Sequence, residues 1–387
     1  MKFKRVFLIV LDSLGVGETI DAQSYDDKGA NTLGNIIKNY DLFVPNLEKL
    51  GFLNTLTMNN KESEAYYTIA RPKNKGKDSL SGHYELMGIE NSIPYKTFAE
   101  GDFPREMLES IANETKRGII GNIAGNSISI INKLGDRHKE TGSLIIYTTC
   151  DSNLEVAAHE DIIPINELYQ YAEIIREITK REEWKVGRVI ARPFVGENGE
   201  YTLTSNSRCY TLTPPNKSVL DILKNNNYQV ISIGKIHDLY NGFGITKIIK
   251  SGSNQEGLNK LTDIMDKNFE GLCYLNLSDF DTLYGHNRDV KGYAKEIEAF
   301  DVEIPIILNK LNIDDLLIVT ADHGCDPTMP GCNHTRENVP VLVYSRLFKN
   351  PGQIEVLETL ADIGATIVDN FSLERPWMGS SFLDKLK

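Results

Sequence analysis

The chain has 387 residues, of which 41% are hydrophobic and 25% are charged, and its formal net charge is −12 at pH 7. This acidic balance argues against non-specific nucleic-acid binding, which needs a basic face. Five cysteines without a CxxC motif favour a reducing, cytoplasmic location, and no stretch approaches the length of a membrane span. No self-pairing signature stands out, so we expect a monomer, and the length predicts two domains.

The first predicted element is a strand over residues 6–11 that runs directly into Asp12. A short continuous apolar run is typical of a strand buried on both faces. A carboxylate at its end is a candidate metal ligand, although an aspartate in a turn before a helix is the commoner role. Helices are predicted over residues 31–40 and 45–50.

A polar, glycine-flanked segment over residues 75–85 contains two serines, Ser79 and Ser81. A serine hydroxyl is a weak nucleophile until a base or a metal activates it. If Ser79 begins a helix beside a cation, its alkoxide is stabilised and the helix N-terminus can bind phosphate. The alternative is a capping box in which Ser79 or Ser81 caps the helix and Glu85 lies in solvent. Both interpretations can hold at once.

The pattern changes between residues 96 and 212, where we predict an inserted α+β cap domain. Core segments 1–95 and 213–387 flank it, and Pro214-Pro215 marks the return, because two prolines make a stiff boundary. Arginine forks suit phosphate, but each arginine here could also be a solvated surface charge. The predicted helices are 104–116 and 164–180, the predicted strands are 143–149, 186–192 and 201–204, and the notable polar residues are Asp151, Arg188, Arg192 and Arg208.

Alternating helices and strands resume after the boundary and predict a doubly wound, mainly parallel sheet. In such sheets, ligands bind at the carboxyl ends of the strands. Lys235, directly after one strand, faces that edge. The predicted strands are 228–234, 272–277, 315–320 and 339–345, and the predicted helices are 216–226, 254–267, 291–311 and 357–371.

Acids and imidazoles follow several of these strands, and both are metal ligands. Two divalent ions a few ångströms apart need roughly six protein ligands together with bridging oxygens. Any one of these residues alone would be read as structural, but their shared position at strand ends and glycine-rich turns predicts a two-metal centre beside Ser79. The six candidates are Asp12, Asp281, His286, Asp322, His323 and His334.

Five motifs together resemble those of the phosphopentomutase family, in the alkaline phosphatase superfamily, over nearly the whole chain. The resemblance implies an alkaline-phosphatase-like core with an inserted cap and two Mn²⁺ ions. It also implies that Asp12, Asp322 and His323 hold one ion, and that Asp281, His286 and His334 hold the other. The motifs are residues 10–13, 77–79 with Gly82-His83, 281–286, 320–324 and 334–337.

The resemblance further implies a reaction that interconverts ribose 1-phosphate and ribose 5-phosphate, and their deoxy forms. Ser79 matches the phosphorylated nucleophile, and a sugar bisphosphate is both intermediate and primer. By the same resemblance, Asp151 holds the ribose, and the distal phosphate is held by Arg188, Arg208 and Lys235.

The chain departs from the family pattern at several positions. The nucleophile is usually a threonine, and the serine here leaves Ser81 as a rival. Tyr84 replaces the usual tryptophan, and Asn333 is a further difference near the metal loops. Two cysteines in those loops, Cys325 and Cys332, would shift the metal preference towards Zn²⁺, because thiolates favour softer ions.

Three alternatives remain open. A metal-dependent phosphatase would share the ligands but admit water, and a cofactor-independent phosphoglycerate mutase would share the core and the serine. A non-catalytic protein with structural ions is the third. A small phosphorylated sugar is the partner that the resemblance favours.

Overall fold

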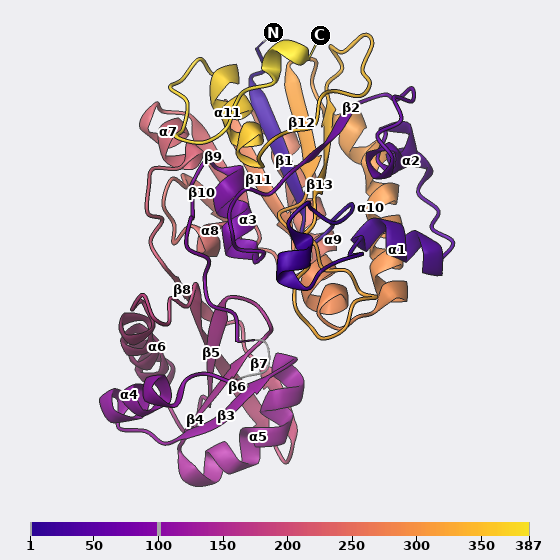
Figure 1. Ribbon diagram of the computed structural model, residues 1–387. Coiled ribbons are helices and arrows are strands. Elements are labelled where there is room, and N and C mark those ends of the chain that lie inside the picture. The colour runs from indigo at the N-terminus through magenta and orange to yellow at the C-terminus, as the bar shows by residue number, and fades with distance from the viewer. Residues whose placement is uncertain (1, 99–101, 387) are drawn as a thin grey trace. The chain divides into compact units, whose positions relative to one another are not determined.

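Two segments of the chain, Met1–Pro94 and Pro214–Lys387, fold together into one unit, and Tyr95–Thr213 forms a second. A computed structural model describes residues 2–98 and 102–386 (Figure 1). We call the two parts the core unit and the inserted unit. The boundaries expected from sequence, after residues 95 and 212, lie beside these transitions.

The core unit is built on a seven-stranded sheet in the order β10-β9-β11-β1-β12-β13-β2. Every neighbouring pair up to β12 is parallel, and only β13 runs against its neighbours. This confirms the predicted mainly parallel sheet. The strands are β1 (Arg5–Leu11), β2 (Tyr66–Ala70), β9 (Gln229–Ile233), β10 (Lys247–Ile249), β11 (Gly271–Leu277), β12 (Asp315–Thr320) and β13 (Val339–Tyr344).

The central strand β1 fixes the position of the site. Val10 is in register with Asn276 of β11 and with Thr320 of β12, so the carboxyl ends of three adjacent strands coincide. All three strands are buried along their whole length, which explains their continuous apolar sequences. Residues that follow these strands are therefore brought to one edge of the sheet.

Helices cover both faces of the core sheet (Figure 1). One layer contains α1 (Thr32–Asn39), α2 (Pro45–Lys49), α9 (Asn254–Met265) and α10 (Val290–Lys310). The other layer contains α3 (Ser79–Leu86), α7 (Val219–Asn225), α8 (Ile236–Leu239) and α11 (Ala361–Asn370).

The last helix begins later than expected. The apolar pattern predicted a helix from residue 357, but α11 begins at Ala361. Leu357 instead pairs with the edge strand β2, where its N–H donates to the Ile69 carbonyl at 2.9 Å. The strands β2 and β10, which are short edge strands of the sheet, were not predicted from the sequence.

The inserted unit has a mixed sheet in the order β3-β4-β5-β6-β7, with β8 paired to β6. Helices α4 and α6 pack on one face over a shared apolar cluster, and α5 packs on the other face over a second cluster. Among residues 2–98 and 102–386, no helix combines the length and apolar character that a bilayer span requires. The elements are β3 (Ile119–Ala124), β4 (Leu144–Thr148), β5 (Asn153–His159), β6 (Arg188–Glu197), β7 (Glu200–Leu203), β8 (Arg208–Thr211), α4 (Arg105–Thr115), α5 (Ser127–Thr141) and α6 (Ile165–Thr179).

Candidate active site

Three buried carboxylates lie at the shared strand edge. Asp12 follows β1, Asp322 follows β12, and Asp281 lies in a π-helical turn after β11. Their side chains are at most 4% exposed, and each has one oxygen that accepts no hydrogen bond from the described residues. A buried carboxylate oxygen without a donor is costly, and a bound cation removes that cost. This edge therefore fits divalent cations.

The first group of ligand atoms surrounds Asp12 and Asp322. His323 Nε2 lies 3.4 Å from Asp12 Oδ1 and 3.3 Å from Asp322 Oδ2. His83 is a further candidate ligand, because its Nε2 lies 3.4 Å from Asp322 Oδ2. His83 lies in one of the family motifs, but it was not among the metal ligands predicted from the sequence. The available signal was its i, i+4 spacing from Ser79, which puts both side chains on one face of α3.

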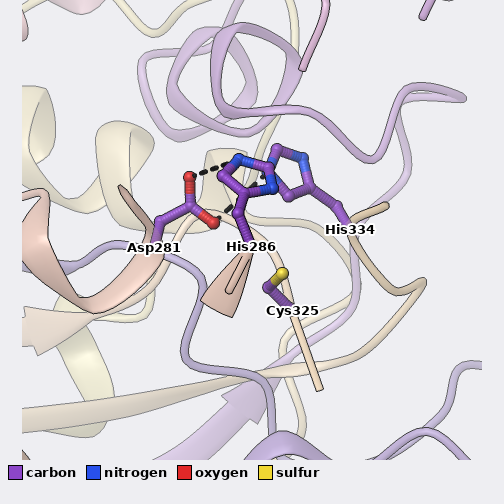
Figure 2. Close-up of side chains that lie close together, drawn as sticks. All are labelled: Asp281, His286, Cys325 and His334. Atoms are coloured by element: carbon purple, nitrogen blue, oxygen red, sulfur yellow. Dashed lines mark hydrogen bonds and ion pairs between the residues drawn. The ribbon is translucent and has the colours of Figure 1, made fainter. Parts of the chain in front are cut away.

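The second group contains Asp281, His286 and His334 (Figure 2). His286 Nε2 lies 3.1 Å from Asp281 Oδ2, and His334 Nε2 lies 3.4 Å from Asp281 Oδ1. The Nε2 atoms of the two histidines are 3.3 Å apart. Converging imidazole nitrogens and a carboxylate are a typical donor set for a divalent transition metal. Cys325 also belongs to this group and was not predicted as a ligand.

The π-helical turn, Phe280–Gly285, explains why Asp281 and His286 face the same space. The N–H of His286 donates to the Asp281 carbonyl, which is an i to i+5 hydrogen bond. His286 Nδ1 lies 2.8 Å from the Cys332 carbonyl, so Nδ1 carries the proton and Nε2 keeps its lone pair. The turn therefore directs the Asp281 carboxylate and His286 Nε2 into the same space, where both can bind one metal ion.

His323 joins the two groups. Its ring stacks on the ring of His334, with centroids 3.9 Å apart and an interplanar angle of 30°. His323 Nδ1 lies 3.1 Å from the Gly324 carbonyl, so Nε2 is the nitrogen that faces Asp12, Asp322 and Ser79. The two groups therefore form one continuous centre.

Ser79 is the first residue of α3, and its Oγ lies 3.1 Å from His323 Nε2. Gly82 allows this approach, because a Cβ at residue 82 would lie 2.2 Å from the Asp322 carbonyl oxygen. The alternative in which Ser79 or Ser81 caps the helix is wrong, since Asp78 caps α3 and accepts from Ser81 N at 3.1 Å. The Ser81 hydroxyl donates to Asp78 Oδ2 at 2.5 Å. Of the two serines, Ser79 is the one in contact with the candidate metal ligands.

Glu85 does not lie in solvent, as the capping-box alternative required. Its carboxylate is fully buried and accepts from Lys73 N at 2.8 Å, Asn74 N at 2.6 Å and the Thr359 hydroxyl at 2.6 Å. Burial raises the pKa of Glu85, although these donors act in the opposite direction. Glu85 thus anchors the loop that leads into Ser79.

Arg336 holds the same loop through its carbonyls. The side chain is 2% exposed, and its guanidinium donates to the Asn74 carbonyl at 2.7 Å and to the Pro72 carbonyl at 2.9 Å. Arg336 follows His334 by two positions. It therefore connects the loop that carries His334 to the loop that precedes Ser79. Sequence reasoning gave it no role.

The pKa values of the buried carboxyl groups show how bound cations would stabilise the site. Burial raises the pKa of Asp322 well above its ordinary value, and the nearby Asp12 charge adds to this. Burial also opposes ionisation of Asp281, but His286 and His334 outweigh it and hold the pKa of that carboxyl well below its usual range. A divalent ion favours the ionised form of every carboxylate around it.

The remaining predicted residues lie in both units. Lys235, directly before α8, is half-buried. Burial opposes ionisation of Asp12, but His323, with a smaller contribution from the Lys235 charge, lowers the pKa of that carboxyl. In the inserted unit, Asp151 and Arg188 are buried and form an ion pair with each other. The Arg208 guanidinium lies over the rings of Tyr169 and Tyr210, at 5.2 Å from each centroid.

Arg192 has a structural explanation. Its guanidinium makes two hydrogen bonds of 2.9 Å to the carboxylate of Glu155 on the neighbouring strand. A bidentate pair of this kind satisfies both side chains. The position of the Arg192 side chain is therefore explained by its ion pair with Glu155.

Comparison with known families identifies the class of protein. The model of the metalloenzyme superfamily matches residues 4–375. The chain therefore belongs to the metalloenzyme superfamily, whose fold is alkaline-phosphatase-like. This agrees with the mainly parallel sheet and with the acids and imidazoles at its edge.

Solved structures show similarity over almost the whole chain. The PH0037 protein from Pyrococcus horikoshii is 16% identical with a TM-score of 0.50, and the match covers 98% of this chain and 100% of that one. Leishmania mexicana phosphoglycerate mutase is 10% identical with a TM-score of 0.49, covering 98% and 97%. Alkaline phosphatase from the Antarctic bacterium TAB5 is 16% identical with a TM-score of 0.37, covering 97% and 99%. The first similarity supports a shared fold.

Proposed function

We propose that the protein is a phosphopentomutase, which interconverts ribose 1-phosphate and ribose 5-phosphate and their 2-deoxy forms. The observation that carries the proposal is the contact between Ser79 and His323 at a centre of buried acids and imidazoles. A hydroxyl in that place suits phosphoryl transfer through a phosphoserine. The family resemblance of the motifs supplies the pentose substrate.

Two divalent ions, Mn²⁺ by the family resemblance, would be held in this centre. The proposed ligands of one ion are Asp12, Asp322 and His323, and those of the other are Asp281, His286 and His334. When bound, such ions neutralise the charge of the transferring phosphoryl group and lower the pKa of the serine hydroxyl. The unpartnered oxygens of the three carboxylates fit this donor role.

Ser79 carries the phosphoryl group in the proposed cycle. The bond between Ser79 Oγ and phosphorus breaks as a bond forms from phosphorus to the free hydroxyl of the sugar phosphate, and the proton of that hydroxyl is taken up by Ser79 Oγ. The resulting bisphosphate returns its other phosphoryl group to Ser79 and leaves as the isomer. The N–H groups at the start of α3 favour negative charge on the serine phosphate.

A mutase must also hold its substrate and exclude water from the phosphoserine. We assign the distal phosphate to Arg188, Arg208 and Lys235, and the ribose to Asp151. Arginine suits this role because its planar fork binds phosphate through two hydrogen bonds. The inserted unit is the proposed cap.

Product analysis tests the proposal. Purified protein is incubated with ribose 1-phosphate and Mn²⁺, with and without a sugar bisphosphate primer, and the products are separated. We expect ribose 5-phosphate, formed faster with primer. Release of inorganic phosphate without isomer would identify a phosphatase instead. Conversion of 3-phosphoglycerate to 2-phosphoglycerate, with ribose 1-phosphate unchanged, would identify a phosphoglycerate mutase.

A further inference from the structure

A sulfur atom lies in the second group of metal-ligating side chains. Cys325 Sγ is within 4.8 Å of the ligand atoms of Asp281, His286 and His334. Figure 2 shows the sulfur directed towards the acid and the two imidazoles. The Cys325 side chain is fully buried and is therefore shielded from solvent.

Gly285 shows how close the sulfur comes to the carboxylate. A Cβ at this position would lie 3.1 Å from Cys325 Sγ and 3.2 Å from Asp281 Oδ1. That oxygen accepts no hydrogen bond from the described residues, and Asp281 is 3% exposed. The sulfur and an unpartnered carboxylate oxygen therefore border the same small space, which the glycine leaves open.

The sulfur is held in place by Arg288. One guanidinium nitrogen, Nη1, donates to Cys325 Sγ at 3.2 Å and to the Gly285 carbonyl at 3.1 Å. Another, Nη2, donates to the Asn333 carbonyl at 2.6 Å. Burial raises the pKa of the Cys325 thiol, and the Arg288 cation acts in the opposite direction. Supporting partners of this kind orient metal ligands.

We propose that Cys325 is a ligand of the ion held by Asp281, His286 and His334, and that this site selects Zn²⁺ over Mn²⁺. The inference rests on the ligand set of the proposed function. One thiolate, two imidazoles and one carboxylate make the four-donor N/S/O set that zinc prefers. Metal binding forms the metal–sulfur bond and releases the thiol proton to solvent.

The two ion sites then differ in character. The site of Asp12, Asp322 and His323 offers only oxygen and nitrogen donors and suits Mn²⁺. The second site carries a soft donor. The centre is therefore a mixed one, in which the two positions fill with different metals.

Cobalt substitution tests the sulfur ligand directly. The full-length protein is stripped with a chelator and titrated with Co²⁺, and absorption in the near ultraviolet is recorded. We expect a sulfur-to-cobalt charge-transfer band in the wild type and in Cys209→Ser, the control. Cys325→Ser and Cys325→Asp should lack the band. Because aspartate keeps a donor at this position, Cys325→Asp should still bind two ions, and circular dichroism confirms that each variant is folded.

Metal competition tests the selectivity. Dialysis against equal Zn²⁺ and Mn²⁺, followed by elemental analysis, should give one zinc per wild-type chain at the second site. In Cys325→Asp the Zn²⁺ affinity of that site should fall by at least about 10-fold, because the loss of a residue that only supports a metal ligand already costs about that much. A band that persists without Cys325 overturns the inference, as does loading of both sites with Mn²⁺. These readouts do not depend on turnover, so they separate failure of this inference from failure of the proposed mutase activity.

Discussion

The hydroxyl of Ser79 lies 3.1 Å from Nε2 of His323, although the two residues are 244 positions apart in the chain. His323 Nδ1 faces a backbone carbonyl, so Nε2 is the ring nitrogen directed at the serine hydroxyl. The same ring stacks on His334. One imidazole thus links the candidate nucleophile to both groups of metal-ligating side chains.

Removal of the Ser79 hydroxyl should abolish turnover without loss of metal. For Ser79→Ala we expect turnover to fall by roughly 10³-fold or more, because loss of a nucleophile removes the covalent route. Metal content by elemental analysis should be unchanged. Ser81→Ala is the matched control and should lose only a hydrogen bond to Asp78, which is worth about 1 kcal/mol of stability. The opposite pattern in the two variants would make Ser81 the nucleophile.

Divalent metal should stabilise the folded core. The buried carboxylates repel one another and leave oxygens without donors, so chelation should lower the free energy of unfolding. Restoring metal at about 100 times its dissociation constant should add about 2.7 kcal/mol per site, measured by urea unfolding. The double variant Asp281→Asn, Asp322→Asn serves as the control and should not respond to chelator. Equal stability of the chelated and metal-loaded wild type would contradict the metal assignment.

Arg336 should act as a positioning residue for Ser79. A lysine cannot reach several carbonyls with one fork, so Arg336→Lys should loosen the loop of Pro72 and Asn74. Displacement of a reacting group by about 1 Å can cost roughly 10²-fold in rate, and we expect kcat to fall by about that factor with metal content kept.

The control for this prediction is Arg71→Lys, on the same loop. Arg71 is 43% exposed and pairs with the exposed Glu358, so its replacement should leave kcat unchanged. If both variants lose kcat equally, the effect comes from general weakening of the loop, and the assignment to Arg336 is wrong.

Glu337 should make stability depend on pH. Burial raises its pKa to about 7 against the opposing hydrogen bonds from Thr335 and Thr32, whereas the unfolded value is 4.5. The folded protein therefore binds this proton more tightly. The contribution to stability is fully present below the unfolded pKa and is lost as pH rises through about 7.

Urea unfolding at several pH values measures this effect. Between about pH 5 and pH 8, Glu337→Gln should remove a decline of about 3 kcal/mol in the free energy of unfolding, on the basis of roughly 1.4 kcal/mol per pKa unit. Glu358→Gln, at an exposed position, should keep the wild-type slope. An unchanged slope in Glu337→Gln would show that this carboxyl is already ionised in the folded protein at low pH.

The sequence predicted the fold class and the set of residues that the structure brings to one edge of the sheet. Both rest on local patterns: apolar runs mark buried strands, and parallel strands carry whatever follows them to the same edge. Asp12, Asp281 and Asp322 could therefore be grouped before any contact was known. The edge strand β2 was missed because a short strand at an edge has a weak periodic signal.

The partners of these residues could not be read from the sequence. His83 and Cys325 lie at the metal-binding edge, and Glu85 and Arg336 hold one loop, through contacts between segments that are far apart in the chain. Glu85 was expected in solvent because a helical position does not reveal what packs against it. The choice between Ser79 and Ser81 likewise depended on which hydroxyl faces His323.

By itself, then, the sequence determined which chemical groups follow which strands, because that order is covalent and strand burial is visible in composition. Only the tertiary structure decided which of those groups touch and which side chains hold them in place. Those properties depend on distances of a few ångströms between residues hundreds of positions apart. A hydrogen bond or a metal–ligand bond is lost when the two atoms move apart by such a distance.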